Sequence, residues 1–390
     1  MTIDELLARV SDEVIVFESF EKKLREEKKL RIKMGFDPTK PDLHLGHAVG
    51  LRLLKKFQEA GHTIIFLVGD YTAKIGDPSG RNSLRPVLSD EEIKENTNTY
   101  FSQVEKLLDI SKAEIHSNSE WYEKMTFDEL LSIAGKFTVQ QIIERDDFQK
   151  RIKEGHDIGL HEVLYPLMQA YDSVVLKADV ECGGTDQKFN MLAGRSLMKK
   201  VDLPAQDVVT IKLLVGLDGK NKMSKSLGNY IAINDAPEDM YGKVMSIPDD
   251  LIMDYFKLCT DVETEALKII EDEAKENPRD TKAKLAKLIV EMYHSEEEAD
   301  KAAVEFDRIF KNHEKPTEMP VKKIEKNEYR ADELLVECEL SSSKSEARRL
   351  IEQNAVEIEG EKITEPEKMV EIKDQMIIQV GKRRFVKIKR

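Results

Sequence analysis

The chain has 390 residues, of which 35% are charged and 40% are hydrophobic, and its formal net charge is −14 at pH 7. This length predicts more than one domain and a true hydrophobic core. The acidic balance excludes indiscriminate binding to nucleic acid, because such affinity depends mainly on neutralising phosphates. No apolar run approaches the length of a membrane span. The acidic, helix-patterned N-terminus lacks the features of a secretory or transit signal.

The cysteines, Cys182, Cys259 and Cys338, are far apart and lack the spacing of metal ligands. We therefore expect no zinc site and no disulfide framework, and a reducing cytoplasm is the simplest location for the protein.

An expected strand and an expected helix meet near residue 40. Residues 31–36 alternate in character, residues 37–42 are rich in turn formers, and helical spacing continues to a stop at Gly61. The tetrapeptide His44-Leu45-Gly46-His47 thus begins a helix, where free N–H groups and the helix dipole favour a phosphate. Gly46 leaves room for a nucleotide base against the backbone. Alone, the tetrapeptide is equally consistent with a capping turn that carries two incidental histidines.

A second motif, Lys222-Met223-Ser224-Lys225-Ser226, follows a turn at residues 218–221 and an apolar stretch, 213–217, that we interpret as the end of a buried strand. Glycines 219 and 228 bracket the motif and allow it to open and close. Lys220, Lys222 and Lys225 are suited to balance the charge of a leaving pyrophosphate. A lysine-rich loop is usually solvated surface, but the full pentapeptide after a strand and a glycine turn favours a phosphate-binding loop.

Strands and helices alternate up to about residue 229. The expected strands are 31–36, 63–68, 173–176 and 208–215. Their apolar runs predict a parallel sheet covered on both faces, with ligands at the carboxyl ends of the strands. Residues 121–161 interrupt this alternation as a mostly helical insertion, and its apolar positions available for a subunit interface are Phe137, Val139 and Ile142.

The pattern after residue 230 is helical and carries no catalytic constellation, with a break at Asn277-Pro278. Residues from about 330 form a third, small unit. Ser343 and Glu346 have the spacing of a capping box, and alternating strands follow with turns at Glu359-Gly360 and Gly381. Basic residues crowd the end of the chain: Lys382, Arg383, Arg384, Lys387, Lys389 and Arg390. A basic tail on an acidic body indicates local contact with RNA, and the alternative is an ordinary solvated hairpin.

Together, the two motifs resemble the signatures of class I aminoacyl-tRNA synthetases. Further stretches resemble bacterial tyrosyl-tRNA synthetases in order and approximate spacing over essentially the whole chain: Gly35-Phe36-Asp37-Pro38-Thr39, Ile75–Gly80, Tyr165-x-x-x-Gln169-Ala170-Tyr171-Asp172 and Gly183–Gln187. The resemblance implies an α/β fold with a doubly wound, Rossmann-like parallel-sheet catalytic domain over 1–229, including the insertion at 121–161 and the lysine loop at 218–228. A helical tRNA-contacting domain (230–328) and a small α+β S4-like RNA-binding domain (329–390) are then expected.

The resemblance also implies a role for each matching residue. The catalytic set, which serves the phosphates, is Thr39, His44, His47, Arg81, Arg85, Lys222 and Lys225. The tyrosine-binding set is Asp77, Tyr165, Gln169, Asp172 and Gln187. The ATP-binding set is Asp37, Gly46, Gly184, Asp186, Met223 and Ser224. The RNA-binding set is Lys344, Arg348, Arg349, Lys382, Arg383 and Arg384.

These residue types suit the implied chemistry. The ammonium of an amino acid needs acceptors such as Asp77 and Gln169, and a buried phenol finds its strongest acceptor in a carboxylate, here Asp172. One position departs from the family pattern. Many members have a tyrosine two residues before Gly-Phe-Asp-Pro as a second contact to the substrate hydroxyl, and this chain has Lys33. Either Asp172 works with a different partner, or Lys33 points away from the pocket.

The expected function is that of a tyrosine–tRNA ligase. Tyrosine and ATP give tyrosyl-adenylate and pyrophosphate, and the terminal ribose of tRNA(Tyr) then attacks the adenylate. The expected partners are tRNA(Tyr), L-tyrosine, ATP with Mg²⁺ and a second copy of the chain, and no membrane. The alternatives are a tryptophan-specific relative, a synthetase-like RNA-binding protein without catalysis and a small-molecule adenylyltransferase. The S4-like tail disfavours the first and the last, and the intact histidine and lysine motifs disfavour the second.

Overall fold

The structure is a computed structural model that describes residues 2–26, 28–79, 88–311, 319–324, 326–381 and 384–390. It divides the chain into two compact units, Met1–Ala299 and Asp300–Arg390. Across these described ranges, no helix combines the length and the apolar character needed to cross a membrane.

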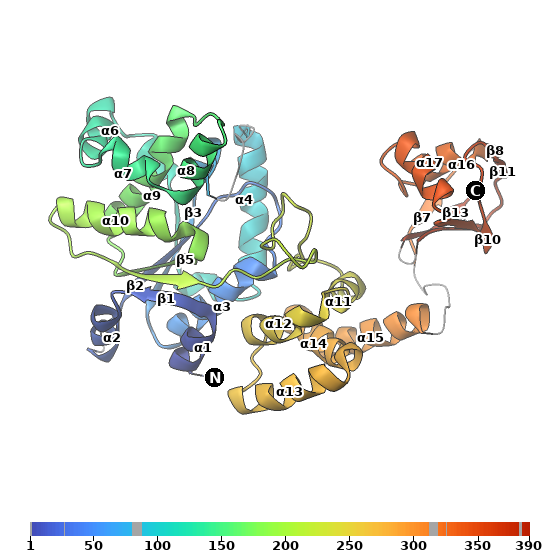
Figure 1. Cartoon of the computed structure of the whole chain (residues 1–390), viewed down its shortest axis with the longest axis horizontal. Coiled ribbons are helices and arrows are strands. Elements are labelled where there is room, and N and C mark those ends of the chain that lie inside the picture. The colour runs from blue at the N-terminus through green and yellow to red at the C-terminus, as the bar shows by residue number, and fades with distance from the viewer. Residues whose placement is uncertain (1, 27, 80–87, 312–318, 325, 382–383) are drawn as a thin grey trace. The chain divides into compact units, whose positions relative to one another are not determined.

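A sheet of six described strands lies at the centre of the first unit (Figure 1), in the order β1-β6-β5-β2-β3-β4. All neighbouring strands are parallel except β1 with β6. The connections from β2 lead to β3 on one side and later to β5 on the other, so a crevice forms at the carboxyl end of β2. The strands are β1 (Ser11–Ile15), β2 (Arg31–Phe36), β3 (Thr63–Val68), β4 (Glu114–Ser117), β5 (Val180–Gly184) and β6 (Asp207–Ile211).

The burial of the central strands follows from their composition. All of β6 and all of β3 after Thr63 are buried, as expected for apolar parallel strands that are covered on both faces. The larger covering helices are α1 (Ile3–Val10), α2 (Phe17–Arg25), α3 (Leu45–Glu59), α4 (Asp90–Val104), α9 (Leu160–Leu176) and α10 (Lys188–Lys200). The predicted strands 31–36 and 63–68 and the predicted helix from His44 to Gly61 are confirmed. Gly61 has a φ of 89°, which is a backbone conformation that glycine adopts readily at a helix end.

Two strand predictions are wrong. Ser173–Leu176 belongs to α9, because its apolar residues continue a helical spacing that begins at Leu160, and a short apolar run does not distinguish a strand from a buried helix. The predicted strand 208–215 is confirmed as far as Ile211, where β6 ends, and is wrong beyond it, so residues 213–217 are not the end of a strand, and Leu213 is 41% exposed. Strands β1 and β4 were not predicted because they are short, polar edge strands, and β5 escaped prediction because it contains a glutamate and two glycines.

The segment predicted as a helical insertion is helical, with four short helices before α9: α5 (Ser119–Tyr122), α6 (Phe127–Ala134), α7 (Val139–Ile143) and α8 (Asp146–Lys153). The expectation that Ile142 is available to a partner is wrong, because it is 2% exposed in a core cluster with Phe148 and Leu167. Phe137 packs partly buried against the same cluster, whereas Val139 is 65% exposed.

Helices follow the sheet, as predicted: α11 (Pro237–Met245), α12 (Ile252–Cys259), α13 (Thr264–Glu276), α14 (Pro278–Tyr293) and α15 (Glu296–Phe310). Asn277 accepts a hydrogen bond from the Asp280 N–H and caps α14, which explains the predicted break. Arg52 of α3 holds the end of α12 by donating to the carbonyls of Leu258 and Thr260, each at 2.6 Å.

The second unit contains a five-stranded sheet among its described residues, in the order β10-β9-β12-β13-β7, and a strand pair β11-β8. The turn at Glu359-Gly360 has positive φ at both residues, 52° and 84°, as a two-residue hairpin requires. Ser343 caps α17 as predicted, but Glu346 accepts from Ser342 instead of from the backbone of the cap. The elements are β7 (Val321–Lys323), β8 (Glu328–Arg330), α16 (Ala331–Glu337), α17 (Lys344–Glu352), β9 (Val356–Ile358), β10 (Glu361–Lys362), β11 (Met369–Glu371), β12 (Ile377–Val380) and β13 (Arg384–Lys389).

Candidate active site

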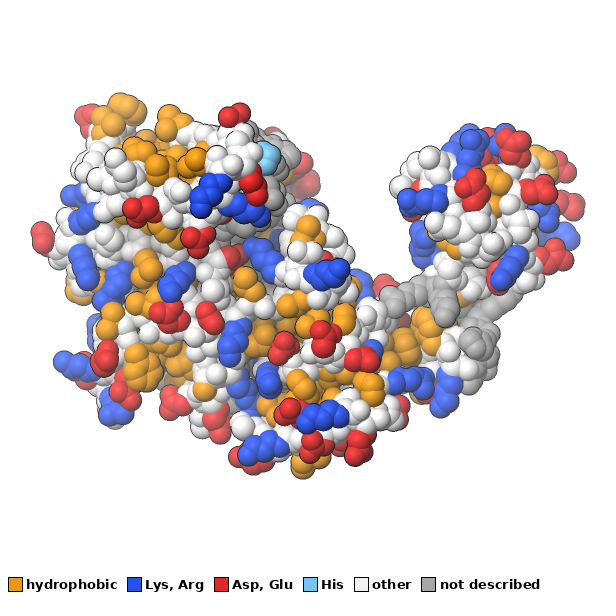
Figure 2. Space-filling model, viewed as in Figure 1, with side chains coloured by type: hydrophobic (Ala, Val, Ile, Leu, Met, Phe, Trp, Pro, Cys, Tyr) orange, Lys and Arg blue, Asp and Glu red, His pale blue; other side chains and the backbone are white. Residues whose placement is uncertain are grey.

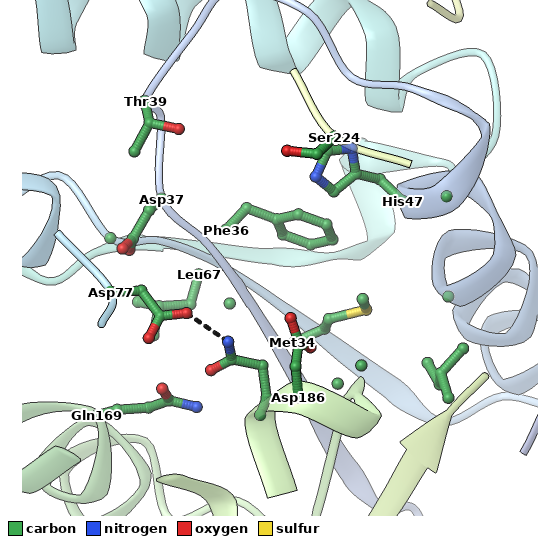
Figure 3. A pocket seen from close by; sticks show the side chains of 18 of the residues that line it. Met34, Phe36, Asp37, Thr39, His47, Leu67, Asp77, Gln169, Asp186 and Ser224 are labelled. Carbon is green, nitrogen blue, oxygen red and sulfur yellow. Dashed lines mark hydrogen bonds between the residues drawn. The ribbon is translucent and has the colours of Figure 1, made fainter. Parts of the chain in front are cut away.

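A cavity of about 540 Å³ opens at the carboxyl ends of β2 and β5, where the strand order reverses. Figure 3 shows side chains from separate elements pointing into it, among them Asp37, Asp77, Gln169 and Asp186. Arg81 and Arg85 lie outside the described residues. The remaining predicted residues of the first unit all line the cavity: Asp37, Thr39, His44, Gly46, His47, Asp77, Tyr165, Gln169, Asp172, Gly184, Asp186, Gln187, Lys222, Met223, Ser224 and Lys225.

The two histidines lie at the start of α3. The backbone N–H of His44 donates to Nδ1 of His47 at 3.2 Å, so the proton of the neutral His47 ring is on Nε2. Burial, reinforced by the charge of Lys225, lowers the pKa of His44 to about 3. Burial also lowers the pKa of His47 well below its usual value. Both rings are therefore neutral at pH 7 and act as hydrogen-bonding groups, not as cations.

The lysine loop is docked against the cavity. Lys225 is 9% exposed and donates to the carbonyl of Lys40 at 3.0 Å and to the hydroxyl of Tyr100 at 2.5 Å. Lys40 in turn donates to the carbonyl of Lys225 at 2.8 Å, and Lys222 forms an ion pair with Asp186. In this conformation both lysines of the motif are held by oxygen atoms of the protein.

A fixed carboxylate lies where β2 ends. Asp37 accepts a hydrogen bond from the Tyr165 hydroxyl at 2.8 Å and another from the Thr72 hydroxyl at 2.9 Å. The Tyr165 hydroxyl uses its hydrogen in the bond to Asp37, and the lone pairs of its oxygen can still accept a hydrogen bond from a ligand.

Asp77 is another carboxylate of the cavity wall. One of its oxygens accepts from the Ser79 N–H at 2.9 Å, and the other accepts from the Gln187 amide at 2.5 Å, the bond dashed in Figure 3. In the same view Gln169 projects toward the space beside Asp77. These groups form a concentration of acceptors suited to an ammonium ion.

Asp172 lies deeper and is 2% exposed. It accepts hydrogen bonds from Trp121 at 3.0 Å, from the Tyr122 hydroxyl at 2.9 Å and from Asn118 at 3.4 Å. Burial raises the pKa of Asp172 to about 7, and the positive charge of Lys33 opposes this rise. A carboxylate at this depth is a strong acceptor for a phenol hydroxyl.

Lys33 does not point away from the pocket. Its side chain lines the cavity and forms a buried ion pair with Glu181 at 2.9 Å, and it donates to the Ser173 hydroxyl at 2.7 Å. Glu181 also accepts from Gln169 at 3.2 Å. The buried lysine–glutamate pair therefore contacts Gln169, and the positive charge of Lys33 acts on Asp172.

The cavity is also lined by residues that the sequence motifs did not predict, namely Lys40, Tyr100 and Glu181. A glutamate within the otherwise apolar strand Val180–Gly184 was a usable signal, because buried charges need partners. Tyr100 comes from α4, and no local pattern in the sequence indicated that it would meet the lysine loop.

The predicted RNA-binding residues that the structure describes lie in the second unit. Lys344, Arg348 and Arg349 lie on α17, and Arg384 begins β13, whereas Lys382 and Arg383 are outside the described residues. Arg348 donates to the buried Asp332 at 2.9 Å, but its side chain stays 50% exposed. Lys344 pairs with Glu333 at 2.8 Å and remains 58% exposed.

Comparison with known proteins agrees with this geometry. Residues 25–311 match the family model of class I tRNA synthetases for tryptophan and tyrosine, and residues 311–388 match the model of the C-terminal domain of tyrosine–tRNA ligases. The tyrosine–tRNA ligase of Thermotoga maritima is 49% identical over 98% of this chain and 96% of its own length. Tyrosine–tRNA ligase 2 of Clostridium acetobutylicum is 46% identical over 99% of this chain and 98% of its own length.

Solved structures show the same fold. A tyrosyl-tRNA synthetase from Archaeoglobus fulgidus, complexed with L-tyrosine, matches with a TM-score of 0.61 and 26% identity, over 76% of this chain and 98% of that one. A C-terminally truncated mitochondrial tyrosyl-tRNA synthetase from Aspergillus nidulans has a TM-score of 0.65 at 24% identity, over 79% of this chain and 94% of that one. The chain belongs to the class I tRNA synthetases of the tryptophan and tyrosine family, which confirms the predicted family and makes it an enzyme that uses ATP.

Proposed function

We propose that the cavity activates L-tyrosine at one end with ATP bound at the other. The reaction is that of a tyrosine–tRNA ligase, as the sequence predicted. This assignment rests on one observation, which is that the two ends of the cavity are lined by different sets of side chains. His44, His47 and the lysines of the loop lie at one end, and the buried Asp172 and Glu181 lie at the other together with Asp77, Gln169 and Gln187.

At the amino-acid end, Asp77, Tyr165, Gln169 and Gln187 surround the substrate ammonium. Asp172 accepts the phenol O–H and Tyr122, Trp121 and Asn118 hold its carboxylate in place. Because hydrogen bonds to a charged acceptor are strong and directional, phenylalanine would leave Asp172 without its partner and bind more weakly.

At the ATP end, the backbone N–H of Gly46 at the start of α3 and Nε2–H of His47 donate to the phosphates. Gly46 admits the adenine ring close to the backbone, and Asp37, Gly184, Asp186, Met223 and Ser224 contact the nucleoside. Lys222 and Lys225 leave their protein partners to neutralise the charge that develops on the leaving pyrophosphate, helped by Thr39 and by Arg81 and Arg85. Catalysis is then mainly positioning of the tyrosine carboxylate in line with the α-phosphate.

Magnesium belongs to this proposal as a companion of ATP. Among the described residues no group of three or more histidine, cysteine or acidic side chains could hold a metal ion. Such a wall fits Mg²⁺ held chiefly by substrate phosphates and water, which is its usual mode of binding, and the ion would add positive charge to the phosphates.

A homodimer is proposed through the insertion. Figure 2 shows orange atoms over α6 and α7, whose exposed apolar side chains are Phe127 (71% exposed), Leu131 (53%) and Val139 (65%). Ile152 of α8 (49%) and Leu160 of α9 (78%) are also exposed. A surface of this kind commonly pairs with a second apolar surface. Sedimentation of Phe127→Glu/Leu131→Glu should show monomers if this face joins two copies, and an unchanged dimer would contradict the assignment.

The second unit is proposed to bind tRNA(Tyr) through α17 and the basic end of the chain, in a cytoplasmic enzyme. The functional division into 1–229, 230–328 and 329–390 belongs to the same proposal, although residues 230–299 pack in one compact unit with the sheet. Removing residues 312–390 should leave ATP–pyrophosphate exchange intact and greatly reduce transfer to tRNA. The tRNA affinity of the full chain should also fall more steeply with salt than that of the shortened chain. Transfer at the full rate by the shortened chain would contradict this role.

The experiment that tests the proposed chemistry is ATP–pyrophosphate exchange with each amino acid in turn. Exchange should depend on tyrosine, and His47→Ala and Lys222→Ala should reduce it strongly. Tryptophan-dependent exchange, or normal exchange in both variants, would contradict the assignment.

A further inference from the structure

Arg145 is a buried arginine that the proposed reaction does not use. It lies immediately before α8, within the insertion, and is 4% exposed. Its guanidinium donates to Asn190 at 2.7 Å and to the Ser79 hydroxyl at 2.8 Å, and it forms an ion pair with Asp147 at 3.0 Å. Two of these partners lie outside the insertion, beside the cavity.

Both partners lead to Asp77. The Asn190 amide donates to Gln187 at 2.9 Å, and the Gln187 amide donates to one oxygen of Asp77 at 2.5 Å. The Ser79 N–H donates to the other oxygen of Asp77 at 2.9 Å. Arg145 and Asp77 are thus the two ends of a closed ring of hydrogen bonds through Asn190, Gln187 and Ser79.

The chemistry of the two ends sets the direction of every bond between them. An arginine can only donate, so Asn190 must present its oxygen to Arg145 and its NH₂ group to Gln187. Gln187 must then present its oxygen to Asn190 and its NH₂ group to Asp77, which as a carboxylate can only accept. The ring therefore holds both amides in one orientation and holds both oxygens of Asp77 in a defined plane.

The charges around Arg145 also leave Asp77 as an anion. Asp147 lies beside Arg145 and neutralises it locally, so the arginine does not cancel the negative charge of Asp77. Asn190 is fully buried, and hydrogen bonds in such surroundings are stronger than in water. Asp77 remains a pre-oriented anion at the cavity wall.

We propose that Arg145 is a positioning residue for the substrate ammonium, which acts through Asn190, Gln187 and Ser79 to orient Asp77. This inference rests on the proposed role of Asp77. It assigns to the insertion a part in amino-acid recognition, although Arg145 touches no substrate.

The test uses inhibitors that separate the ammonium from the rest of tyrosine. Tyramine keeps the phenol and the ammonium, and 3-(4-hydroxyphenyl)propionate keeps the phenol and the carboxylate. Both are measured as competitors of tyrosine in ATP–pyrophosphate exchange with the full-length chain. In Arg145→Lys, which keeps the charge but loses the planar fork, and in Asn190→Leu, which breaks the ring, we expect the tyrosine KM and the tyramine Ki to rise about tenfold. The Ki of the propionate and the KM of ATP should stay within about twofold, since neither ligand reaches the ammonium site.

Arg151→Lys is the matched control. Arg151 is the other buried arginine of this segment, 1% exposed, and it contacts Glu162 at 2.8 Å and the carbonyl of Asp157, away from the ring at Asp77. The proposal would be overturned if Arg145→Lys and Asn190→Leu raised the Ki of both inhibitors equally, or if Arg151→Lys raised the tyramine Ki selectively as well. Either result would show that Arg145 only packs the insertion.

Asp77→Asn separates this proposal from the one on which it rests. If Asp77→Asn changes the Ki of tyramine and of the propionate equally, the ammonium site itself is misassigned. If Asp77→Asn raises only the tyramine Ki, but Arg145→Lys and Asn190→Leu do not, the ammonium site stands and the positioning role of Arg145 is wrong. Asn190→Leu should also add little to the tyramine effect of Asp77→Asn, because both changes act on one interaction.

Discussion

The two ends of the cavity are built on different physical principles. At the ATP end, Lys222 and Lys225 rest on Asp186, Tyr100 and Lys40, which are partners that a triphosphate can replace. At the tyrosine end, Asp172 and Lys33 lie in buried networks of hydrogen bonds and ion pairs whose members come from several elements. Because these groups are buried, they cannot replace their protein partners with water.

This difference separates the effects expected of mutations. An interaction that forms only as charge develops on the phosphates changes the rate of activation and leaves the affinity for tyrosine alone. A network that is complete before the substrate arrives contributes to folding and to affinity. Four predictions follow this contrast from the largest expected effect to the smallest.

Lys33→Met should destabilise the first unit by about 3–5 kcal/mol, because it leaves the buried Glu181 without its cation. Unfolding in denaturant, followed by tryptophan fluorescence of Trp121, measures this loss. Lys33→Met/Glu181→Gln should recover most of it, since no buried charge is then unpaired. Lys28→Met is the surface control, because Lys28 is 59% exposed in its pair with Asp179, and it should cost less than about 1 kcal/mol. Equal unfolding midpoints for Lys33→Met and the unmodified chain would contradict the prediction.

Lys225→Ala should slow formation of tyrosyl-adenylate by about two to three orders of magnitude, which corresponds to about 2.7–4 kcal/mol of transition-state stabilisation. Pre-steady-state kinetics at saturating ATP provides the rate, and equilibrium binding provides the tyrosine affinity, which should be unchanged. Lys220→Ala is the control in the same loop, because Lys220 is exposed and does not line the cavity. A mutant that binds tyrosine poorly but reacts at the normal rate would contradict the assignment of Lys225 to the phosphates.

Asp172→Asn should lower kcat/KM for tyrosine by about 1.5–3 kcal/mol, the free energy of a hydrogen bond to a charged group. The preference for tyrosine over phenylalanine should narrow, while the KM of ATP should hold, because Asp172 lies at the amino-acid end. Steady-state exchange with both amino acids decides the point. An unchanged tyrosine kcat/KM would mean that Asp172 does not recognise the phenol.

The pH dependence of tyrosine use should report Asp172, whose pKa burial raises to about 7. Because the pKa of Asp172 is higher in the folded protein, folding favours its protonated form. The contribution of Asp172 to stability is therefore present below its ordinary pKa of 3.8 and is lost as the pH rises through 7. The carboxylate that accepts the phenol forms over the same rise. We therefore expect kcat/KM for tyrosine to increase by up to about tenfold per pH unit below 7 and then to level off. Asp172→Asn should lack this acid limb, and an identical limb in that variant would assign it to another group.

The local parts of the molecule were predictable from the sequence. Two examples are the start of the helix that carries His44 and His47 and the turn that precedes Lys222. Both features depend only on residues within a few positions of each motif, so the local pattern was sufficient to predict them. The apolar strands β2 and β3 were predictable for the same reason. The apolar run Val174-Val175-Leu176 was not, because its length fits a strand and a helix equally and the spacing of the whole of α9 decides between them.

The tertiary structure alone decided which buried charges meet. Lys33 on β2 pairs with Glu181 on β5, 148 positions later in the chain, because these strands are neighbours in the parallel sheet. Arg145 reaches Asp77 through Asn190 of α10, through Gln187 just before α10, and through Ser79, for the same kind of reason. The sequence by itself determined the chemistry of the motifs and the family. The partners of its buried polar groups were set only when packing brought distant elements together, because a buried charge is stable only beside a group that the fold itself supplies.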